Sequence, residues 1–331
     1  MNRAILVLSI GYYAIRITST FFSWTRVGEM AISFTHYRFF LDSLMVIMIW
    51  WMLARYVAKK KKYQWILVLE IGSIIFFLLT SYYHIDQVYQ GKRRSYQHSS
   101  IATSQPIARV LYANILKSNT HYEELRLLIE KNNPSIIFFA ERQRHHWQSL
   151  ETVLASYPHR MQYSYGSVVF SRFPFEEKES KKTTDWRTYW HIAVSFSSWS
   201  LYDILFAHTT SPVSPQNYSS RNQQLIILGE AMKEQSLPTI VLGDLNVTPY
   251  SPWYQATIAI QNGYENQVFH QQFPSTRWFA NNDWFPQTHI DHILTTKDIL
   301  LWPLTIIPLD WSDHHAIMVD IYSWSTNDDE T

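Results

Sequence analysis

The segment PTIVLGDLNVTP, residues 238–249, combines a short apolar run with two polar side chains that could act together on a phosphate ester. Residues 240–242 predict a buried strand, and Gly243-Asp244-Leu245-Asn246 follows at once, so the strand ends in an acid and an amide. Residues two apart in an extended segment point to the same side. Asp244 and Asn246 are therefore candidates to hold a water molecule and a phosphate oxygen, although GDxN is also an ordinary turn sequence.

Other polar residues lie at or near the ends of further predicted strands. They are Asn114 in VLYANIL, Glu141 in IIFFAE, His208 in LFAHTTSP, Asp291 in THIDHIL, and Asp313-His314 in SDHHAI. Taken singly, each has an ordinary structural explanation, such as a surface carboxylate, a buried histidine or a loop. Taken together, their repeated position after apolar strands favours one shared site.

In this order, the motifs resemble those of the endonuclease/exonuclease/phosphatase superfamily, which includes deoxyribonuclease I-like nucleases, bacterial sphingomyelinases and inositol polyphosphate 5-phosphatases. The similarity covers roughly residues 107–322, and GSVVFSR and SSRNQQLIILGEAM resemble further family segments. The resemblance implies an α/β fold, a four-layer sandwich of two mixed β-sheets packed face to face with helices outside. The alternation of predicted elements is compatible with it.

The resemblance also implies a divalent metal ion. Glu141 would be the main ligand, with Asn114 and Asp313 completing or flanking the site. Carboxylate, amide and water ligands suit a hard cation such as Mg²⁺, with Mn²⁺ or Ca²⁺ as alternatives. We therefore expect a metal-dependent hydrolase.

The same resemblance assigns roles in catalysis to the remaining motif residues. Asp244 and Asn246 would hold the attacking water and a phosphate oxygen in line. Asp291 would orient His314, which would contact the phosphate or act as an acid or base. His208 would donate a hydrogen bond to a phosphate oxygen from the other side.

Two alternative chemistries use residues of the same region. A zinc site could be built from histidines at H-x-x-H spacing, but the carboxylate and amide positions would then have no role. The histidines concerned are His289, His292, His314 and His315. A serine hydrolase built on Ser312 lacks the G-x-S-x-G turn. The chain contains no cysteine, which excludes thiolate ligands, disulfides and a thiol nucleophile.

The elements that must position these residues alternate from about residue 107 onward. Predicted strands, besides the one at 240–242, cover residues 109–115, 136–140, 167–171, 191–196, 201–207, 290–295 and 316–321. Predicted helices cover residues 121–131, 146–155, 220–235 and 253–261.

Three apolar segments, at residues 4–22, 39–57 and 65–83, each have the length of a membrane-spanning helix. The four lysines at 59–62 lie in the short loop between the second and third segments, and such a basic loop favours the cytoplasmic side. We therefore expect residues 1–84 to form a transmembrane region that places the rest of the chain outside the cytoplasm.

The predicted organisation continues with a polar linker at 85–105, a catalytic domain at 106–323 and an acidic tail at 324–331. Residues 1–105 carry a net charge of +8, whereas the catalytic domain carries −4 and the tail −3. Nucleic-acid binding by charge leaves a basic footprint, so the acidic catalytic domain argues against a nonspecific duplex nuclease.

Together these patterns predict a metal-dependent phosphoesterase anchored in a bacterial cell membrane, with its catalytic domain facing outward. Its substrate would be a phosphodiester in nucleic acid or in a phospholipid headgroup. The alternative is a catalytically silent module that binds a phosphorylated ligand or partner at the membrane. Beyond the lipid bilayer and this substrate, the sequence indicates no protein partner.

Overall fold

The computed structural model describes residues 24–33, 105–142, 146–163, 166–178, 189–197, 200–259, 263–266, 276–277 and 288–323. The predicted spans at 4–22, 39–57 and 65–83 and the acidic tail lie outside these residues, as does the linker except for residue 105. Within the described part of the chain, none of the helices combines the length and the apolar character needed to cross a bilayer.

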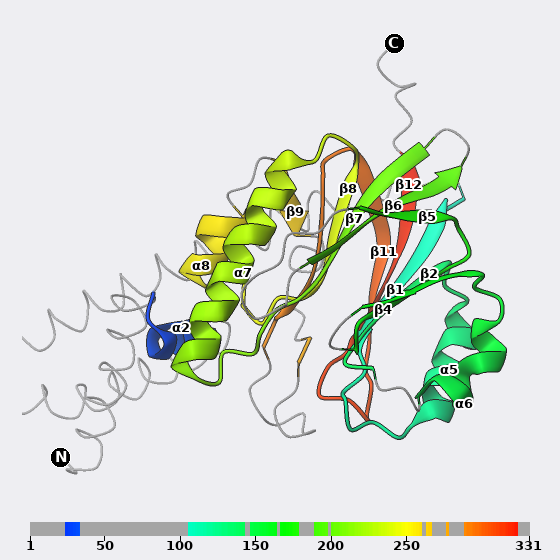
Figure 1. The fold of residues 1–331 in the computed structure, drawn as a ribbon, viewed down its shortest axis with the longest axis horizontal. Helices are drawn as coiled ribbons and strands as arrows, with labels where there is room; N and C mark the ends of the chain where they lie inside the picture. The colour runs from blue at the N-terminus through cyan, green and yellow to red at the C-terminus, as the bar shows by residue number, and fades with distance from the viewer. Residues whose placement is uncertain are drawn as a thin grey trace, which may run out of the picture.

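Two mixed sheets form the centre of the fold, each with six strands in the described residues (Figure 1). The first sheet has the order β11 (Ile299–Ile307), β12 (Ala316–Ser323), β1 (Ala108–Asn114), β2 (Ile136–Ala140), β4 (Val168–Ser171) and β3 (His159–Gln162). The second has the order β5 (Phe175–Lys178), β6 (Tyr189–Ser197), β7 (Ser200–His208), β8 (Thr239–Asp244), β10 (Asp291–Thr295) and β9 (Glu265–Asn266).

Helices cover the outer face of each sheet. The first sheet packs against α5 (Tyr122–Asn132) and α6 (His146–Leu154), and the second against α7 (Pro215–Glu234), α8 (Pro252–Tyr254) and a π-helical turn at Gln255–Ala259. A further short helix, α2 (Arg26–Ile32), lies beside the beginning of α7. The predicted sandwich of two mixed sheets between helices is confirmed.

The side chains of β1 alternate between the two faces of the first sheet and pack in two apolar clusters. Val110 and Tyr112 belong to the apolar cluster between the sheets, whereas Leu111 and Ala113 pack under α5 and α6. Successive side chains of a strand point to opposite faces, so a strand that is buried on both faces is apolar almost throughout.

Strand pairing decides where the polar strand ends meet. β1 and β2 run parallel with Asn114 opposite Ala140, so Glu141 follows at the same edge. β7 and β8 also run parallel, with His208 opposite Asp244. β10 runs antiparallel to β8 and begins with Asp291 opposite Asp244.

Besides β3, β5 and β9, which were not predicted, two elements differ from the sequence prediction for identifiable reasons. α7 begins at Pro215 instead of residue 220, because the Ser214 side chain accepts from Asn217 N and proline suits the first helical turn. β11 was not predicted because Pro303 interrupts the apolar run. The strand lies at a sheet edge and its register shifts near the proline, between Leu301 and Leu304, which is where a strand tolerates proline.

Gly243 directly precedes Asp244 at the end of β8, and its neighbours leave no room for a side chain. Its φ is +139°, and a Cβ atom there would lie 1.8 Å from the carbonyl oxygen of Ala207. We expect Gly243→Ala to lower the free energy of unfolding by more than about 3 kcal/mol in urea denaturation. Gly263→Ala is the control, because Gly263 also has positive φ but open space around it, and it should cost only about 1 kcal/mol. Equal losses in both variants would contradict the steric explanation.

Candidate active site

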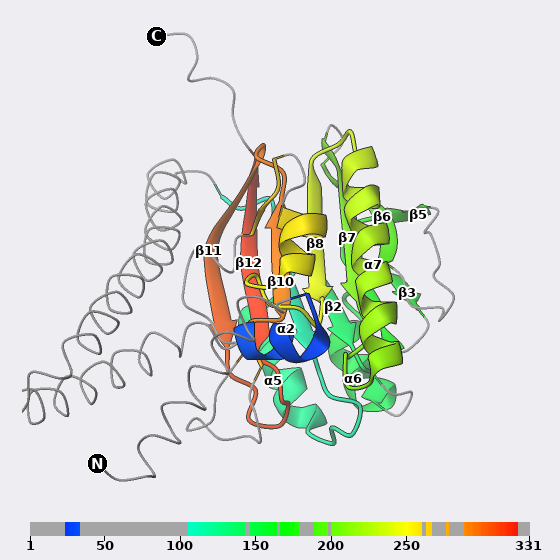
Figure 2. The ribbon, with the colours of Figure 1, turned by 90° about the vertical axis from the view of Figure 1, so that its left-hand side faces the viewer.

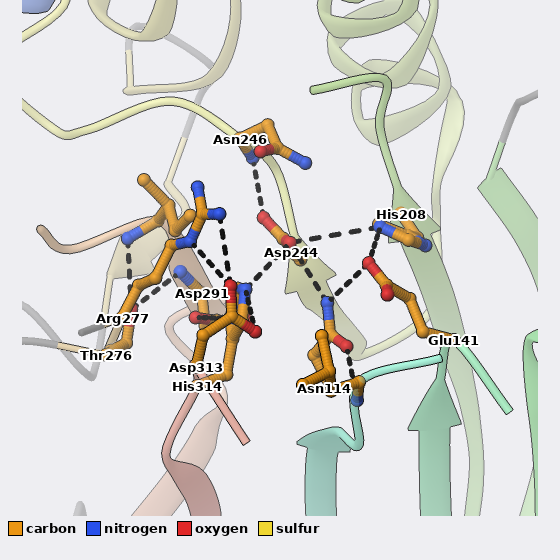
Figure 3. Close-up of polar contacts among 12 residues, drawn as sticks. Asn114, Glu141, His208, Asp244, Asn246, Thr276, Arg277, Asp291, Asp313 and His314 are labelled. Atoms are coloured by element: carbon orange, nitrogen blue, oxygen red, sulfur yellow. Dashed lines mark hydrogen bonds and ion pairs between the residues drawn. The ribbon is translucent and has the colours of Figure 1, made fainter. Parts of the chain in front are cut away.

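The polar strand ends of the two sheets converge into one cluster, shown in Figure 3. The first sheet contributes Asn114 and Glu141, and the second contributes His208, Asp244 and Asp291. His314 joins them from the segment that leads into β12. Residues separated by two hundred positions thus share one site, as the motif order predicted.

Glu141 occupies a strained backbone position at one side of the cluster. Its φ is +60°, a conformation that residues other than glycine adopt at a cost. Its Oε1 accepts from Asn114 Nδ2 at 3.2 Å and lies 3.6 Å from His208 Nε2. Its Oε2 accepts from Lys117 N at 3.2 Å. These bonds fix the direction of a carboxylate that is still partly open to solvent.

Asp244 lies at the centre of the cluster and is almost fully buried. Its Oδ2 accepts from Asn114 Nδ2 at 3.3 Å and lies between two histidines, 3.8 Å from His208 Nε2 and 3.6 Å from His314 Nε2. Its Oδ1 accepts from Asn246 N at 2.9 Å. One carboxylate therefore faces both imidazoles.

His314 is held by a chain of buried hydrogen bonds. Its Nδ1 lies 2.7 Å from Asp291 Oδ2, and the other oxygen of Asp291 accepts from the Tyr112 hydroxyl at 3.0 Å. The Thr276 hydroxyl accepts from the backbone N–H of Asp291 at 3.0 Å. Both oxygens of Asp291 are thus occupied, so this residue orients the imidazole, and Nε2 of His314 is turned toward Asp244.

The carboxylates and imidazoles shift one another's proton affinities. Burial, and then the charge of Asp291, raise the pKa of Asp244 to about 7. Burial alone would lower the pKa of His314, but the charges of Asp291 and Asp244 raise it to about 9. For Glu141, burial is outweighed chiefly by the charge of His208, and its pKa falls below the ordinary value. The site at neutral pH thus combines a cationic His314 with an Asp244 poised to exchange a proton.

Asp313 and Asn246 lie at the edges of the cluster. Asp313 is on the His314 side, where its Oδ2 accepts from Arg277 Nη2 at 3.1 Å. The side-chain amide of Asn246 donates to the Thr209 carbonyl at 2.9 Å, and its backbone has φ +47°. The ligand role of Asp313 and the water-binding role of Asn246 stay predictions.

The donor set fits a divalent cation. Asp244, Asp291 and His314 each offer a ligand atom, and these atoms lie within 4.8 Å of one another. Because Asp291 is already hydrogen-bonded at both oxygens, the carboxylates that remain available are Asp244 and Glu141. Asn114 turns its Nδ2 to both of them, while its Oδ1 accepts from Leu116 N. Oxygen donors of this kind are preferred by Mg²⁺ and similar hard ions.

The hydrogen bonds of His292 and Ser312 argue against the two alternatives, the histidine zinc site and the serine hydrolase. Both ring nitrogens of His292 are engaged, Nδ1 with Asn266 and Nε2 with the Val247 carbonyl, and burial lowers its pKa to about 4. The Ser312 hydroxyl donates to the Asn114 carbonyl at 2.8 Å and accepts from His314 N. Ser312 therefore ties the end of β1 to the His314 segment.

Comparison with known proteins agrees with this geometry. Residues 111–314, more than half of the chain, match the Endonuclease/Exonuclease/phosphatase family. The chain belongs to this family. Membership makes it a metal-dependent hydrolase of phosphodiesters. No curated protein matches the sequence.

Solved structures of this family share the fold. A humanized D. rerio TDP2 is 17% identical, with 65% of this chain and 99% of that chain covered and a TM-score of 0.54. The endonuclease/exonuclease/phosphatase from Beutenbergia cavernae is 15% identical, with 65% and 71% covered and a TM-score of 0.52. The human Nocturnin catalytic domain is 16% identical, with 67% and 97% covered and a TM-score of 0.50.

Sequence reasoning missed several residues that support the family's motif residues. Tyr112 and Thr276 hold Asp291, and Arg277 pairs with Asp313. Tyr112 reads as one more apolar residue of β1, and only its even spacing from Asn114 places it on the inner face. Arg221 supports the loop at Asn246, and the only signal was its place in the family-like segment SSRNQQL.

Metal affinity should rise with pH. Since the pKa of Asp244 is about 7, this carboxyl is uncharged below that pH, and a cation held beside it by Glu141 should bind more tightly once Asp244 is ionised. We expect the dissociation constant for Mn²⁺, measured by isothermal titration calorimetry, to fall as pH rises from 6 to 8, with proton release at pH 6. A dissociation constant that is flat across this range would show that Asp244 is not coupled to the metal.

Proposed function

We propose that the protein is a membrane-anchored enzyme that hydrolyses a phosphodiester, in nucleic acid or in a phospholipid headgroup, by in-line attack of water. The observation that carries this proposal is that Glu141, Asn114 and Asp244 converge at the meeting edges of the two sheets, with Asp244 lying between two imidazoles. This arrangement offers a metal-binding carboxylate, a proton acceptor and two phosphate-binding groups in one place.

The roles of the side chains follow from their positions and proton affinities. Asp244 accepts the proton of the attacking water, since its pKa lies near the working pH. His314, cationic and fixed by Asp291, donates from Nε2 to a phosphoryl oxygen. His208 binds the phosphate from the side of Glu141. As the water oxygen bonds to phosphorus, the bond to the leaving oxygen breaks on the opposite side.

Glu141 and Asn114 are the residues that would hold Mg²⁺, with Mn²⁺ or Ca²⁺ as alternatives. The bound cation supplies positive charge for the phosphoryl oxygens. Asp313 flanks this site from the His314 side and is already paired with Arg277. Lys117 N keeps Glu141 turned toward Asn114.

The net charge of the catalytic domain bears on the substrate class. A net charge of −4 for residues 106–323 disfavours tight binding of duplex DNA through phosphate contacts. A D. rerio TDP2 structure, 18% identical to this chain, was determined with a single-strand DNA product. At this level of identity it supports the fold, so both nucleic acid and lipid phosphodiesters remain in the proposal.

Membrane anchoring places the catalytic domain on the outer side of a bacterial membrane. α2 lies between the first two proposed spans in the sequence, and it contacts α7 of the catalytic domain through Glu29 and Arg221. With the lysine loop at 59–62 inside, both α2 and everything after the third span fall on the outer side. The contact requires α2 and the catalytic domain to share one side, which fits two spans between them, whereas the lysine loop is what favours the outer side.

Turnover tests the activity directly. The detergent-solubilised full chain should hydrolyse bis-p-nitrophenyl phosphate with Mg²⁺, lose activity in EDTA and regain it with Mg²⁺ or Mn²⁺. A panel of single-stranded DNA, duplex DNA, RNA, sphingomyelin and phosphoinositides then identifies the substrate class. Failure to hydrolyse any of these substrates with Mg²⁺, Mn²⁺ or Ca²⁺ would overturn the proposed function.

The absence of cysteine makes the topology simple to test. Lys233→Cys, on the exposed surface of α7, should react with a membrane-impermeant maleimide on intact cells. Lys60→Cys should react only after the membrane is permeabilised. The opposite labelling pattern would place the catalytic domain in the cytoplasm.

A further inference from the structure

Arg221 is a fully buried arginine that joins three parts of the chain. Its Nη2 donates to Glu29 Oε2 at 2.7 Å, its Nη1 to the carbonyl of Asn246 at 2.6 Å, and its Nε to Asn222 Oδ1 at 2.8 Å. A buried guanidinium is tolerated only when it is paired and hydrogen-bonded. Glu29, itself almost fully buried, provides the pairing charge.

The contact at the Asn246 carbonyl affects the position of Asp244. Asn246 has φ +47°, and in this conformation its backbone N–H reaches Asp244 Oδ1 at 2.9 Å. Its side-chain amide is tied to the Thr209 carbonyl. Arg221 therefore holds the carbonyl of the residue whose N–H holds the catalytic carboxylate. Release of the carbonyl would free Asn246 to relax toward the commoner right-handed conformation.

Glu29 belongs to α2, which docks along the same region of the catalytic domain. The Trp24 carbonyl accepts from the Tyr218 hydroxyl at 2.7 Å, and the Trp24 and Trp253 rings meet edge to face at 5.2 Å. Figures 1 and 2 show α2 beside the beginning of α7, the helix that carries Arg221. α2 precedes the family match, which begins at residue 111, by more than seventy residues.

We propose that Glu29 and Arg221 are positioning residues for the catalytic strand end, so that α2 is part of the catalytic unit of this chain. This inference rests on the proposed function in assigning Asp244 its role. Glu29 neutralises and orients Arg221, Arg221 holds the Asn246 carbonyl, and Asn246 N–H aims Asp244 between the two imidazoles. The region before the family domain thus does more than anchor the enzyme.

Kinetics of the full chain in detergent test the proposal. Glu29→Ala should lower kcat for bis-p-nitrophenyl phosphate by about 10- to 100-fold with little change in KM, because substrate contacts are intact while the base is misplaced. Glu29→Gln, whose amide oxygen can still accept from Arg221, should recover a large part of the activity. Met30→Ala, on the exposed side of the same helix, is the matched control and should leave turnover unchanged.

A double-mutant comparison with Arg221→Lys is the second test. Lysine keeps a charged side chain at the buried position and so leaves no cavity there. If the two residues act as one unit, Arg221→Lys combined with Glu29→Ala should be little worse than Arg221→Lys alone. Additive losses, or a loss in Glu29→Ala no greater than its loss of folded protein, would show that α2 only stabilises the fold.

Amide hydrogen exchange decides the proposal even without a substrate. In Glu29→Ala, exchange should accelerate in residues 244–248 while β1 and β2 keep their protection. Unchanged exchange in residues 244–248 would overturn the inference. If Glu29→Ala shows this faster exchange but the wild-type chain hydrolyses no phosphodiester, only the proposed function is refuted.

Discussion

Replacement of Glu141 by Gln is expected to lower kcat by more than about a hundredfold, because this change removes the charge of the proposed main metal ligand. The amide oxygen can still accept from one of the two donors, Asn114 Nδ2 or Lys117 N, and the side chain is only half-buried, so the fold should be preserved. The measurement is the Mg²⁺-dependent turnover of bis-p-nitrophenyl phosphate, together with the thermal unfolding midpoint.

Glu151→Gln is the matched control for this prediction, since Glu151 is an exposed carboxylate on α6. It should leave both turnover and unfolding unchanged. Full activity in Glu141→Gln would exclude Glu141 as a metal ligand, and unfolding of that variant would show that its role is structural.

Replacement of His314 by Ala is expected to lower kcat by about 10²- to 10⁴-fold, the range for loss of a positioned acid or base. The substitution removes the group that faces Asp244 at 3.6 Å and leaves Asp291 buried without its cationic partner. The control is His159→Ala on β3, away from the site. Equal activity in the two variants would remove His314 from the mechanism.

The pH profile gives an independent check on the His314 assignment. Because its pKa is raised to about 9, the wild-type rate should fall as pH rises through that value and the imidazolium loses its proton. Asp291→Asn removes the negative charge that stabilises the imidazolium, so the pKa drops and the basic limb should move to lower pH. A basic limb that stays in place would show that another group titrates there.

Much of the site could be predicted because its residues follow strong local patterns. Asn114, Glu141, His208 and Asp244 each come at the end of an apolar strand, and parallel pairing then brings such ends to one edge. The family's motif order supplied the remaining information, including the pairing of Asp291 with His314. Both the sandwich architecture and the cluster are therefore recoverable from the sequence.

The rest depends on contacts that leave no local signal. Arg277 lies in an isolated bridge opposite Thr288 and His314, with no strand pattern to mark it. α2 has only seven residues, and its partner Arg221 follows 192 positions after Glu29. A short helix far from its partner in sequence is stabilised by tertiary packing, which periodicity does not report.

Two features of the site lower the stability of the folded chain. They are the positive φ of Glu141 and Asn246 and the burial of the Asp244 carboxyl. The folded chain keeps the Asp244 proton up to about pH 7, whereas an unfolded chain releases it near 3.8, so the native state weakens as pH rises across that window. Substitutions that relieve the backbone strain, such as glycine at residue 141, should therefore cost activity more than stability.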